Sequence, residues 1–595
     1  MVSVTFLFAA ASALLPFVSA ILPRQSPEYG HDFEFPLPIP PIKEPLTSHT
    51  DYKTGTKIDF YEVKIREFKK RLFPDLGEAT LVGYDGMAPG PTFRIKKGTE
   101  SVVRFVNEYG RKSAVHLHGS YSRAPFDGWA EDTIEPGQYK DYYYPNKQDG
   151  RTLWYHDHAM GITALNVYSG QAGFYIIEDP EMEAKLDLPQ GKYDIPLMFQ
   201  SHFYDASGAI TDMTGERNST FGDTFSVNGQ ILPYLDVEPR KYRFRFLNAA
   251  ASRTFNFTLV EKDWEGPLPM YVVGSDSGFT SHPVETLSLV QAMAERWEVI
   301  IDFSNYRDKE LTLKSSRTFA DEDYEGTGNV LQFRVGRRVT SKQGNGPLPP
   351  KLIDLQLPTD HEKIDQRWNF TRTGVAPNFT WLINNVGFSD VYNRVLRNVP
   401  RGTIEKWILH GGGGWSHPIH IHLVDFQIVS RTAVEPRRNG TAPGRSGVTP
   451  YEAAALKDVS AVGQNEEVTV LAKYAPWAGT YMFHCHNLIH EDHEMMAAFN
   501  VTRLPEWGYP ESMGLLDPMD PKFRAKEYRG TAVRTLRDEV LPMFAELRAY
   551  GNVEEVMREL DEYHATRTPA LTGSAWPTLP PPPPPPTATP TPTPA

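Results

Sequence analysis

Residues 481–500 read YMFHCHNLIHEDHEMMAAFN and contain the one cysteine of this 595-residue chain. Cys485 has a histidine on each side, and His490 and Met495 follow it by five and ten positions. A thiolate, imidazole and a weakly bound thioether are the ligands of a blue-copper electron-transfer site. Secreted proteins normally keep an even number of cysteines for disulfides, so a single one needs another role. The stretch therefore predicts that Cys485 binds copper.

The two neighbours of Cys485 point to a second metal site. If the segment is extended, Cys485 faces one side of the strand while His484 and His486 face the other. A copper bound by the Cys485 sulfur would then be joined through short covalent paths to metals bound by these two histidines, over a distance on the order of 10 Å. The pattern predicts an electron path from one electron-accepting copper to a site with several metals.

Histidines elsewhere in the chain supply enough ligands for such a site. Ten of the 18 histidines lie in four clusters, each of which contains two histidines separated by one residue. The clusters are His116/His118, His156/His158, His417/His420/His422 and His484/His486/His490. Side chains at positions i and i+2 of a strand share a face, so each pair can direct two imidazoles at one place.

The histidine pairs alone do not name the metal, because imidazole binds Cu, Zn, Fe and Ni. A single H-x-H pair is more often exposed or hydrogen-bonded than a metal ligand. Four such clusters together with a lone cysteine favour a metal centre. The run His490-Glu491-Asp492-His493 lacks the H-E-x-x-H spacing, which excludes a zinc protease.

Outside these motifs the chain has the pattern of many short strands. Its 50 prolines and 45 glycines indicate frequent turns between apolar or alternating runs. Examples are residues 101–106, 173–177, 242–247, 297–303, 406–409 and 468–472. This spacing is typical of β-sandwiches, and the length predicts three or four domains. We expect an all-β chain with domains over residues 46–188, 189–350 and 351–525.

The net charge, the single cysteine and the glycosylation sequons narrow the possible partners and the location of the protein. The net charge of −13 and the pI near 5.8 disfavour nucleic acid or an anionic membrane as the main partner. With one cysteine the chain forms no intrachain disulfide. Six N-x-[ST] sequons agree with export: Asn218, Asn256, Asn369, Asn378, Asn439 and Asn500.

The ends of the chain differ from its centre. Residues 1–20 have the apolar run and small-residue end of a signal peptide, with a buried N-terminal helix as the alternative. Residues 21–45 are Pro-rich, as in a leader or pro-segment. Residues 526–570 predict amphipathic helix broken near Gly551, and residues 571–595 form a Pro/Thr-rich tail. We find no second long apolar stretch, so we expect a secreted protein without a membrane anchor.

Four strings of the sequence resemble the multicopper oxidases, the family of laccases, ascorbate oxidases and ferroxidases. They are HLHGSYSRAPFDGWAED (116–132), RTLWYHDHAMGITA (151–164), GWSHPIHIHLVDF (414–426) and YMFHCHNLIHEDHEMMAAFN (481–500). The similarity runs from about residue 50 to about residue 520, and within the family the strings are most similar to the fungal bilirubin oxidases.

The resemblance implies four copper ions per chain. It implies that the type 1 copper is bound by His417, Cys485, His490 and Met495. It assigns to the type 2 copper the ligands His116 and His420. It assigns to one type 3 copper the ligands His118, His156 and His486, and to the other His158, His422 and His484. Met495 as a core side chain is the alternative to its ligand role.

Five further residues match functional positions of the family. Asp127 and Glu491 match carboxylates that deliver protons to the trinuclear site, with a surface salt bridge as the alternative for each. Trp415, Arg372 and Asn487 match residues near the type 1 site and its electron-donor pocket, and Trp415 could equally be core packing. By contrast, two histidines fit no ligand position and are read as ordinary structural or outer residues: His410 and His493.

The resemblance implies three cupredoxin-like Greek-key β-sandwich domains, with the trinuclear site between the first and third. It implies a monomer that oxidises a small-molecule electron donor, bilirubin-like or phenolic, and reduces O2 to water. A laccase-like phenol oxidase and a ferroxidase are alternatives within the family. A copper carrier or simple electron-transfer protein is the alternative from another class, and it would bind one copper instead of four.

Overall fold

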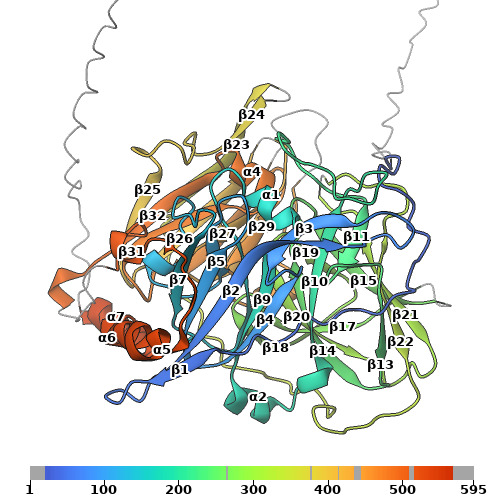
Figure 1. Ribbon diagram of the computed structural model, residues 1–595, viewed down its shortest axis with the longest axis horizontal. Helices are drawn as coiled ribbons and strands as arrows, with labels where there is room; N and C mark the ends of the chain where they lie inside the picture. Colours follow the sequence, from blue (N-terminus) through green and yellow to red (C-terminus); the bar gives the residue numbers. More distant parts are fainter. Residues whose placement is uncertain are drawn as a thin grey trace, which may run out of the picture.

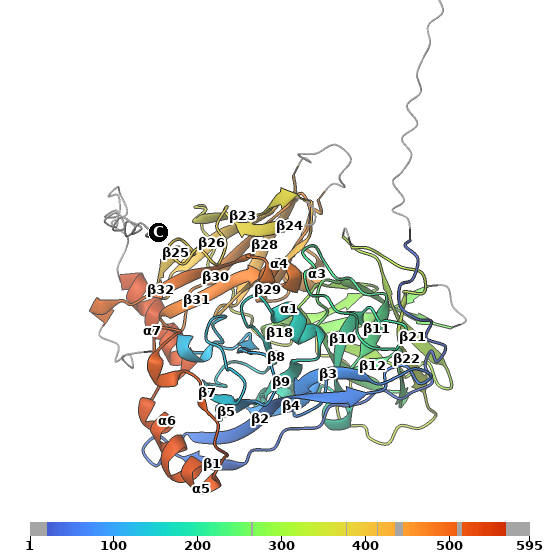
Figure 2. The same ribbon diagram turned by 45° about the horizontal axis from the view of Figure 1, so that its top comes forward.

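The computed structural model describes residues 21–262, 266–319, 321–375, 378–412, 414–434, 444–507 and 515–566. The predicted signal peptide, the sequon at Asn439 and the Pro/Thr-rich tail lie outside the described residues. In the part of the chain that is described, strands predominate and the helices are short, which confirms the all-β prediction. Three pairs of sheets follow one another along the chain, blue, green and yellow to orange in Figures 1 and 2.

The first sheet pair is built mainly from residues 47–178. One sheet has the order β1-β2-β5-β7-β33 with β3 beside β2, and its strands are β1 (Thr47–Thr50), β2 (Lys57–Lys70), β3 (Ala79–Tyr84), β5 (Glu100–Asn107), β7 (Gln138–Tyr144) and β33 (Lys526–Glu527). The other has the order β4-β9-β8-β6, with β4 (Gly90–Lys96), β6 (Val115–His118), β8 (Arg151–Asp157) and β9 (Ala172–Glu178). Side chains from both sheets, such as Val63, Phe105 and Tyr155, share one core.

The second sheet pair covers residues 194–335. Its larger sheet has the order β12-β11-β10-β14-β20-β17-β18, with β10 (Asp194–His202), β11 (Thr224–Val227), β12 (Gln230–Ile231), β14 (Lys241–Asn248), β17 (Met270–Ser275), β18 (Gly278–Thr286) and β20 (Arg296–Asp302). Its smaller sheet has the order β13-β22-β21-β15-β16 with β19 on β15, formed by β13 (Tyr234–Val237), β15 (Phe255–Glu261), β16 (Pro267–Leu268), β19 (Leu289–Gln291), β21 (Glu310–Ser316) and β22 (Asn329–Val335). Phe199, Phe257 and Trp297 lie in the core between them.

The third sheet pair covers residues 366–502. Its sheets have the orders β24-β23-β26-β30-β28 and β25-β32-β31-β27-β29. Their strands are β23 (Gln366–Val375), β24 (Asn378–Ile383), β25 (Val395–Pro400), β26 (Ile404–Gly411), β27 (His417–Ile421), β28 (Phe426–Ala433), β29 (Val459–Val462), β30 (Glu466–Lys473), β31 (Gly479–Cys485) and β32 (Met496–Thr502). Trp407, Val470 and Phe483 fill the space between the two sheets.

The apolar runs that the sequence suggested fall on strands. They coincide with β5, β9, β14, β20, β26 and β30. The division into three domains with boundaries near residues 188 and 350 stays a prediction, although sheet pairing changes partners in these regions.

Short helices connect the strands. They are η1 (Ala124–Phe126), α1 (Thr163–Tyr168), α2 (Pro180–Leu186), η2 (Gly191–Tyr193), α3 (Pro450–Ala453), α4 (Leu488–Asp492), η3 (Pro505–Trp507) and η4 (Pro521–Phe523). Within the described ranges, none of the helices has the length and apolar character needed to cross a bilayer.

The Pro-rich residues 21–45 run along the first and second sheet pairs. Leu37 is buried, and its backbone N–H donates to the Tyr234 carbonyl at 2.7 Å. Further on, the Lys43 N–H donates to the Thr92 carbonyl at 2.8 Å. The segment therefore contributes backbone hydrogen bonds to both pairs, which its aperiodic sequence did not indicate.

The predicted C-terminal helical extension is confirmed. It consists of α5 (Val533–Thr535), the π-helical turn η5 (Leu536–Val540), α6 (Leu541–Leu547) and α7 (Val553–Thr566). Its break falls at residues 548–552, which include the predicted Gly551. The red helices in Figure 2 run from the blue strands to the orange ones. Phe544 packs on Phe126 and Tyr143 of the first pair, with ring centroids 6.1 and 5.1 Å apart.

On this basis we expect Phe544→Ala to destabilise the protein. The ring is buried between the extension and the first sheet pair, and loss of a buried Phe typically costs about 3–5 kcal/mol. The measurement is the thermal unfolding midpoint. Met543→Ala is the matched control, because the neighbouring Met543 side chain is 39% exposed. Equal midpoints for the two variants would contradict a stabilising role for the extension.

Candidate metal centre

Strand register brings the histidine pairs face to face. In the first sheet pair β6 and β8 are antiparallel, with His116 opposite His156. In the third pair β27 and β31 are antiparallel, with His420 opposite His484. Because alternate residues share a face, each register places two H-x-H pairs side by side. The two pairs of strands meet where the first and third sheet pairs adjoin.

Eight buried histidines converge at this junction. They form three groups in which the ligand atoms lie within 4.8 Å of one another: His116/His118/His420, His118/His156/His486 and His158/His422/His484. The last two groups are the sets that the sequence assigned to the type 3 pair. The first joins the predicted type 2 ligands with His118.

Three of these rings have an outward-facing nitrogen in contact with an aspartate. Nδ1 of His116 donates to the Asp127 carbonyl, and Nδ1 of His420 to the Asp458 carbonyl at 2.8 Å. Nδ1 of His422 lies 2.7 Å from the Asp127 carboxylate. These contacts fix the tautomer, because a neutral imidazole carries one proton. The Nε2 atoms of His116 and His420, whose Nδ1 atoms face carbonyl oxygens, are therefore unprotonated.

Nε2 atoms of the group lie close to one another. Nε2 of His420 and Nε2 of His116 are 3.4 Å apart, and Nε2 of His484 is 3.2 Å from Nε2 of His422 and 3.1 Å from Nε2 of His158. Two lone pairs at such distances repel unless a cation lies near both. This convergence of imidazole donors fits bound metal ions, and copper is a metal that imidazole accommodates.

Burial keeps the imidazoles neutral. It lowers the pKa of His156 to about 3 and that of His158 to about 4. The pKa values of His116, His420 and His486 also lie well below the usual range, first because of burial and then because of neighbouring imidazoles. Metal ions bind neutral imidazole, so the group is in the protonation state that binding requires.

A second cluster lies on the other side of β31. The Cys485 Sγ is 3.5 Å from Nδ1 of His417 and 3.7 Å from Nδ1 of His490, and the two nitrogens are 3.3 Å apart. Cys485 thus faces away from the group that its two neighbours join, as expected for an extended segment. Burial raises the pKa of the Cys485 thiol, so a nearby cation is needed to hold it as the thiolate.

Met495 is buried in the same core as Cys485. The Cys485 N–H donates to the Met495 carbonyl, and the Met495 N–H donates to the His490 carbonyl, both at 3.0 Å. These bonds hold the Met495 backbone next to Cys485 and His490. The set of one thiolate, two imidazoles and an adjacent methionine fits a blue-copper site.

Both predicted carboxylates are buried against the histidine group, and neither is a surface salt bridge. Asp127 lies at His116 and His422, and burial raises its pKa well above the usual range. Glu491 Oε2 is 3.0 Å from Nδ1 of His484, and Glu491 Oε1 is 3.4 Å from Nδ1 of His158. Although burial opposes its ionisation, these two imidazoles lower the pKa of Glu491 to about 2.

Of the three residues predicted near the donor pocket, Trp415 and Arg372 lie beside His490, whereas Asn487 is buried at the start of α4. Trp415 is partly buried, with its ring edge-on to His490 at 5.9 Å. The Arg372 guanidinium lies over the Trp415 ring at 5.4 Å. Asn487 is buried: its side chain caps α4 by accepting from the Ile489 N–H. Its amide also contacts the second sheet pair through Ser219 and Ser252 (3.0 and 2.9 Å).

Sequence reasoning missed two residues beside these clusters. The buried Trp381 stacks on His490 with a centroid distance of 3.6 Å and an angle of 24°. The Asp458 carboxylate is 3.2 Å from Nε2 of His118. Neither lies in a histidine-containing motif, so the sequence carried no signal for them. His410 and His493 lie outside the groups; His410 pairs with Glu467, and Nδ1 of His493 donates to the Ile489 carbonyl.

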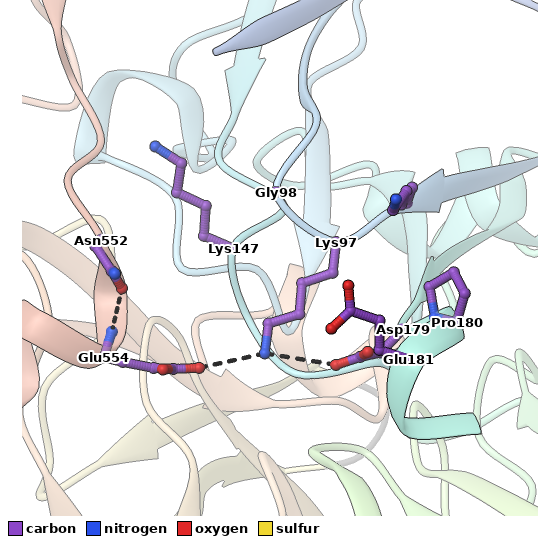
Figure 3. Close-up of a pocket in the computed structure, with 9 residues that line it drawn as sticks. Lys97, Gly98, Lys147, Asp179, Pro180, Glu181, Asn552 and Glu554 are labelled. Atoms are coloured by element: carbon purple, nitrogen blue, oxygen red, sulfur yellow. Dashed lines mark hydrogen bonds and ion pairs between the residues drawn. The ribbon is translucent and has the colours of Figure 1, made fainter. Parts of the chain in front are cut away.

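A surface pocket lies elsewhere, between α2, the turn after β4 and the start of α7 (Figure 3). Its volume is about 450 Å³. Lys97 spans it, with its Nζ 3.4 Å from Glu554 and 3.6 Å from Asp179. The lining residues include no histidine or cysteine. The Lys97–Glu554 pair makes the pocket a contact between the extension and the first sheet pair.

Comparisons with known proteins agree with this geometry. Two multicopper oxidase family profiles match residues 68–182 and 349–504. A bilirubin oxidase from Albifimbria verrucaria is 47% identical over 548 residues, covering 89% of this chain and 93% of that protein. A laccase from Bacillus subtilis (strain 168) is 32% identical over 517 residues, covering 78% of this chain and 98% of the laccase.

The fold has solved counterparts. The crystal structure of McoA multicopper oxidase from the hyperthermophile Aquifex aeolicus superimposes with a TM-score of 0.66 at 24% identity, covering 78% of this chain and 99% of that one. The sheet pairs are therefore cupredoxin-like β-sandwiches. The sequence relatives, the fold and the buried histidine–cysteine clusters lead to one conclusion: this chain belongs to the multicopper oxidase family, the copper oxidoreductases that use O2 as electron acceptor.

Proposed function

We propose that this chain is a secreted bilirubin oxidase-type enzyme. It takes electrons one at a time from an organic donor at the Cys485 cluster and passes them to the histidine group. Four bound copper ions would supply the redox chemistry, accepting electrons at one site and reducing O2 to water at the other. The observation that carries the proposal is the segment His484–Cys485–His486 at the end of β31, which gives its sulfur to one cluster and its imidazoles to the other.

The proposed ligand sets are those implied by the sequence. His417, Cys485 and His490, with Met495 as a weak axial ligand, would hold the type 1 copper. The type 2 copper would be held by His116 and His420. The type 3 pair would be held by His118/His156/His486 and His158/His422/His484. Support comes from the short distances between their donor atoms.

The charge near the type 1 site favours an organic donor with acidic groups. Burial lowers the pKa of His417 and His490, and the charge of Arg372 lowers both further. The Arg372 guanidinium also lies 4.3 Å from the Phe379 ring centroid. A cation over aromatic rings attracts carboxylates and planar π systems, and it repels Fe2+. This argues for a bilirubin-like donor over a ferroxidase role.

Asp127 and Glu491 are the proposed proton carriers. O2 reduction consumes protons at a site that burial separates from water, so side chains must deliver them. The Asp127 Oδ2 lies at His422, and the Glu491 oxygens lie at His484 and His158. Burial raises the pKa of Asp127, so this carboxyl group can hold a proton beside His422.

Export and a monomeric state complete the proposal. The apolar residues 1–20 and the sequons support export, and Asn378, one of the sequons, has an exposed side chain. A monomer is supported because both clusters are assembled from residues of one chain. The donor would be a small molecule that approaches the Trp415 and Arg372 side of the third sheet pair.

Cys485→Ser tests the type 1 site. A hydroxyl is a poor ligand here, so the blue thiolate-to-copper absorption should disappear and oxidation of every donor should collapse. Copper content should fall from four to three per chain, since the histidine group is unchanged. The measurements are visible absorption and metal analysis. A variant that stayed blue would contradict the assignment of Cys485.

A donor panel tests the substrate class. Steady-state kcat/KM should be highest for bilirubin, lower for a phenol and lowest for Fe2+. Arg372→Gln, which removes the cation, should lower kcat/KM for bilirubin more than for an uncharged phenol. A phenol preferred by the wild-type enzyme, with no effect of Arg372→Gln, would identify a laccase-like phenol oxidase instead.

Asp127→Asn tests proton delivery. The variant keeps the shape and removes the carboxylate, so blue absorption and reduction by the donor should stay normal. Recovery of the blue band after mixing reduced enzyme with O2 should slow by ~10²-fold or more, as for loss of a positioned acid–base group. Stopped-flow absorption measures this rate. Recovery as fast as wild type would shift the role to Glu491.

A further inference from the structure

One buried aspartate contacts two histidines of the proposed trinuclear site. The Asp458 carbonyl accepts from Nδ1 of His420 at 2.8 Å, and its Oδ1 lies 3.2 Å from Nε2 of His118. Within the described residues, Nδ1 of His118 has no hydrogen-bond partner. Asp458 therefore leaves Nε2 of His420 and Nδ1 of His118 for a metal. In the proposed ligand sets, His420 belongs to the type 2 copper and His118 to a type 3 copper.

The second sheet pair supplies none of the proposed ligands, but its residue Arg296 fixes the position of this aspartate. Arg296 at the start of β20 forms a two-point pair with the Asp458 carboxylate: Nη1 to Oδ1 at 2.7 Å and Nη2 to Oδ2 at 2.5 Å. Arg296 and Asp458 are both buried. A planar guanidinium fixes both the position and the plane of the carboxylate that it binds.

Arg296 is itself held from all three sheet pairs. Its Nε donates to the Thr152 carbonyl of β8 at 3.0 Å, and its backbone N–H donates to the Asp276 Oδ1 at 2.7 Å. Asp276 Oδ2 in turn accepts from the backbone N–H of Asp458 at 3.1 Å. The guanidinium therefore lies at the point where the first, second and third sheet pairs meet.

The space around the pair is filled. Gly119, which follows His118, has a positive φ of +88°, and a Cβ added there would lie 2.7 Å from both Arg296 Nη2 and Asp458 Oδ2. A larger residue at this position would press on the arginine–aspartate pair. The close approach leaves Asp458 little freedom to turn away from His118.

We propose that Arg296 is a positioning residue for the trinuclear copper site: it locks the Asp458 carboxylate, and Asp458 orients His118 and His420. The inference rests on the proposed copper-binding function. Removing the Arg296 guanidinium would leave the buried Asp458 carboxylate with fewer hydrogen bonds, so it could rotate away from His118. Partners of metal-bound imidazoles typically change metal affinity by roughly 10- to 100-fold when mutated.

Arg296→Lys is the test, because it keeps the positive charge and removes the two-point geometry. Arg245→Lys is the matched control. Arg245 lies in the same sheet, is equally buried, and its Nη1 donates to Thr152 Oγ1 at 2.8 Å, but it pairs with Asp194 and Glu298, away from the histidines. Both variants are titrated with a copper chelator while the blue absorption, the EPR signal of the non-blue copper and the copper content are followed.

Arg296→Lys should lose copper from the histidine group at a chelator activity roughly 10- to 100-fold lower than wild type, with an altered non-blue EPR signal and an intact blue band. Arg245→Lys should retain copper as wild type does. Asp458→Asn, which keeps the side-chain shape, should reproduce the loss, and it decides the question if Arg296→Lys gives no folded protein.

Two results would overturn the inference. One is an Arg296→Lys protein that retains copper and gives the EPR signal of the wild type. If Arg296→Lys does not fold, the same result in Asp458→Asn would overturn the inference. The other is equal copper loss in Arg296→Lys and Arg245→Lys, which would indicate general weakening of the contact between sheet pairs. Failure of the proposed function has a different signature: the wild-type protein itself would hold fewer than four copper ions or lack the blue band.

Discussion

Imidazole nitrogens lie 3.1 to 3.4 Å from one another inside the protein, and this is the constraint on which the rest of the structure depends. Between His116 and His420, whose protons are held outward, the inward lone pairs repel, and burial disfavours relief by protonation. A neutral imidazole directs its lone pair inward only if its proton is held outward. Asp127, Asp458 and Glu491 provide those outer contacts.

The histidines of the group come from two sheet pairs, so neither pair can form the group alone. The register of β6 with β8 and of β27 with β31 sets which imidazoles are neighbours. Alternation along β31 separates the sulfur of Cys485 from the rings of His484 and His486. One strand thus belongs to two clusters, and the path between them is covalent. A shift of register by one residue would destroy both clusters at once.

The second sheet pair contributes contacts in place of ligands. Arg296 reaches Asp458 at the histidine group, and the Arg217 carbonyl accepts from the Trp381 indole at 2.8 Å beside His490. The buried Asn487, next to the Cys485 cluster, accepts from Ser252. The second sheet pair therefore contacts residues beside both the histidine group and the Cys485 cluster.

The sequence by itself determined the strands, the all-β class and the identity of the motifs, because these depend on local order: alternation within a strand, and histidines one residue apart. It pointed to Asp127 and Glu491 through their family positions. Tertiary structure alone decided the places of Trp381, Asp458 and Arg296, and it buried Asn487 against the second sheet pair. These contacts join residues far apart in the chain. No local pattern encodes such contacts, since they arise only when separate sheets pack against one another.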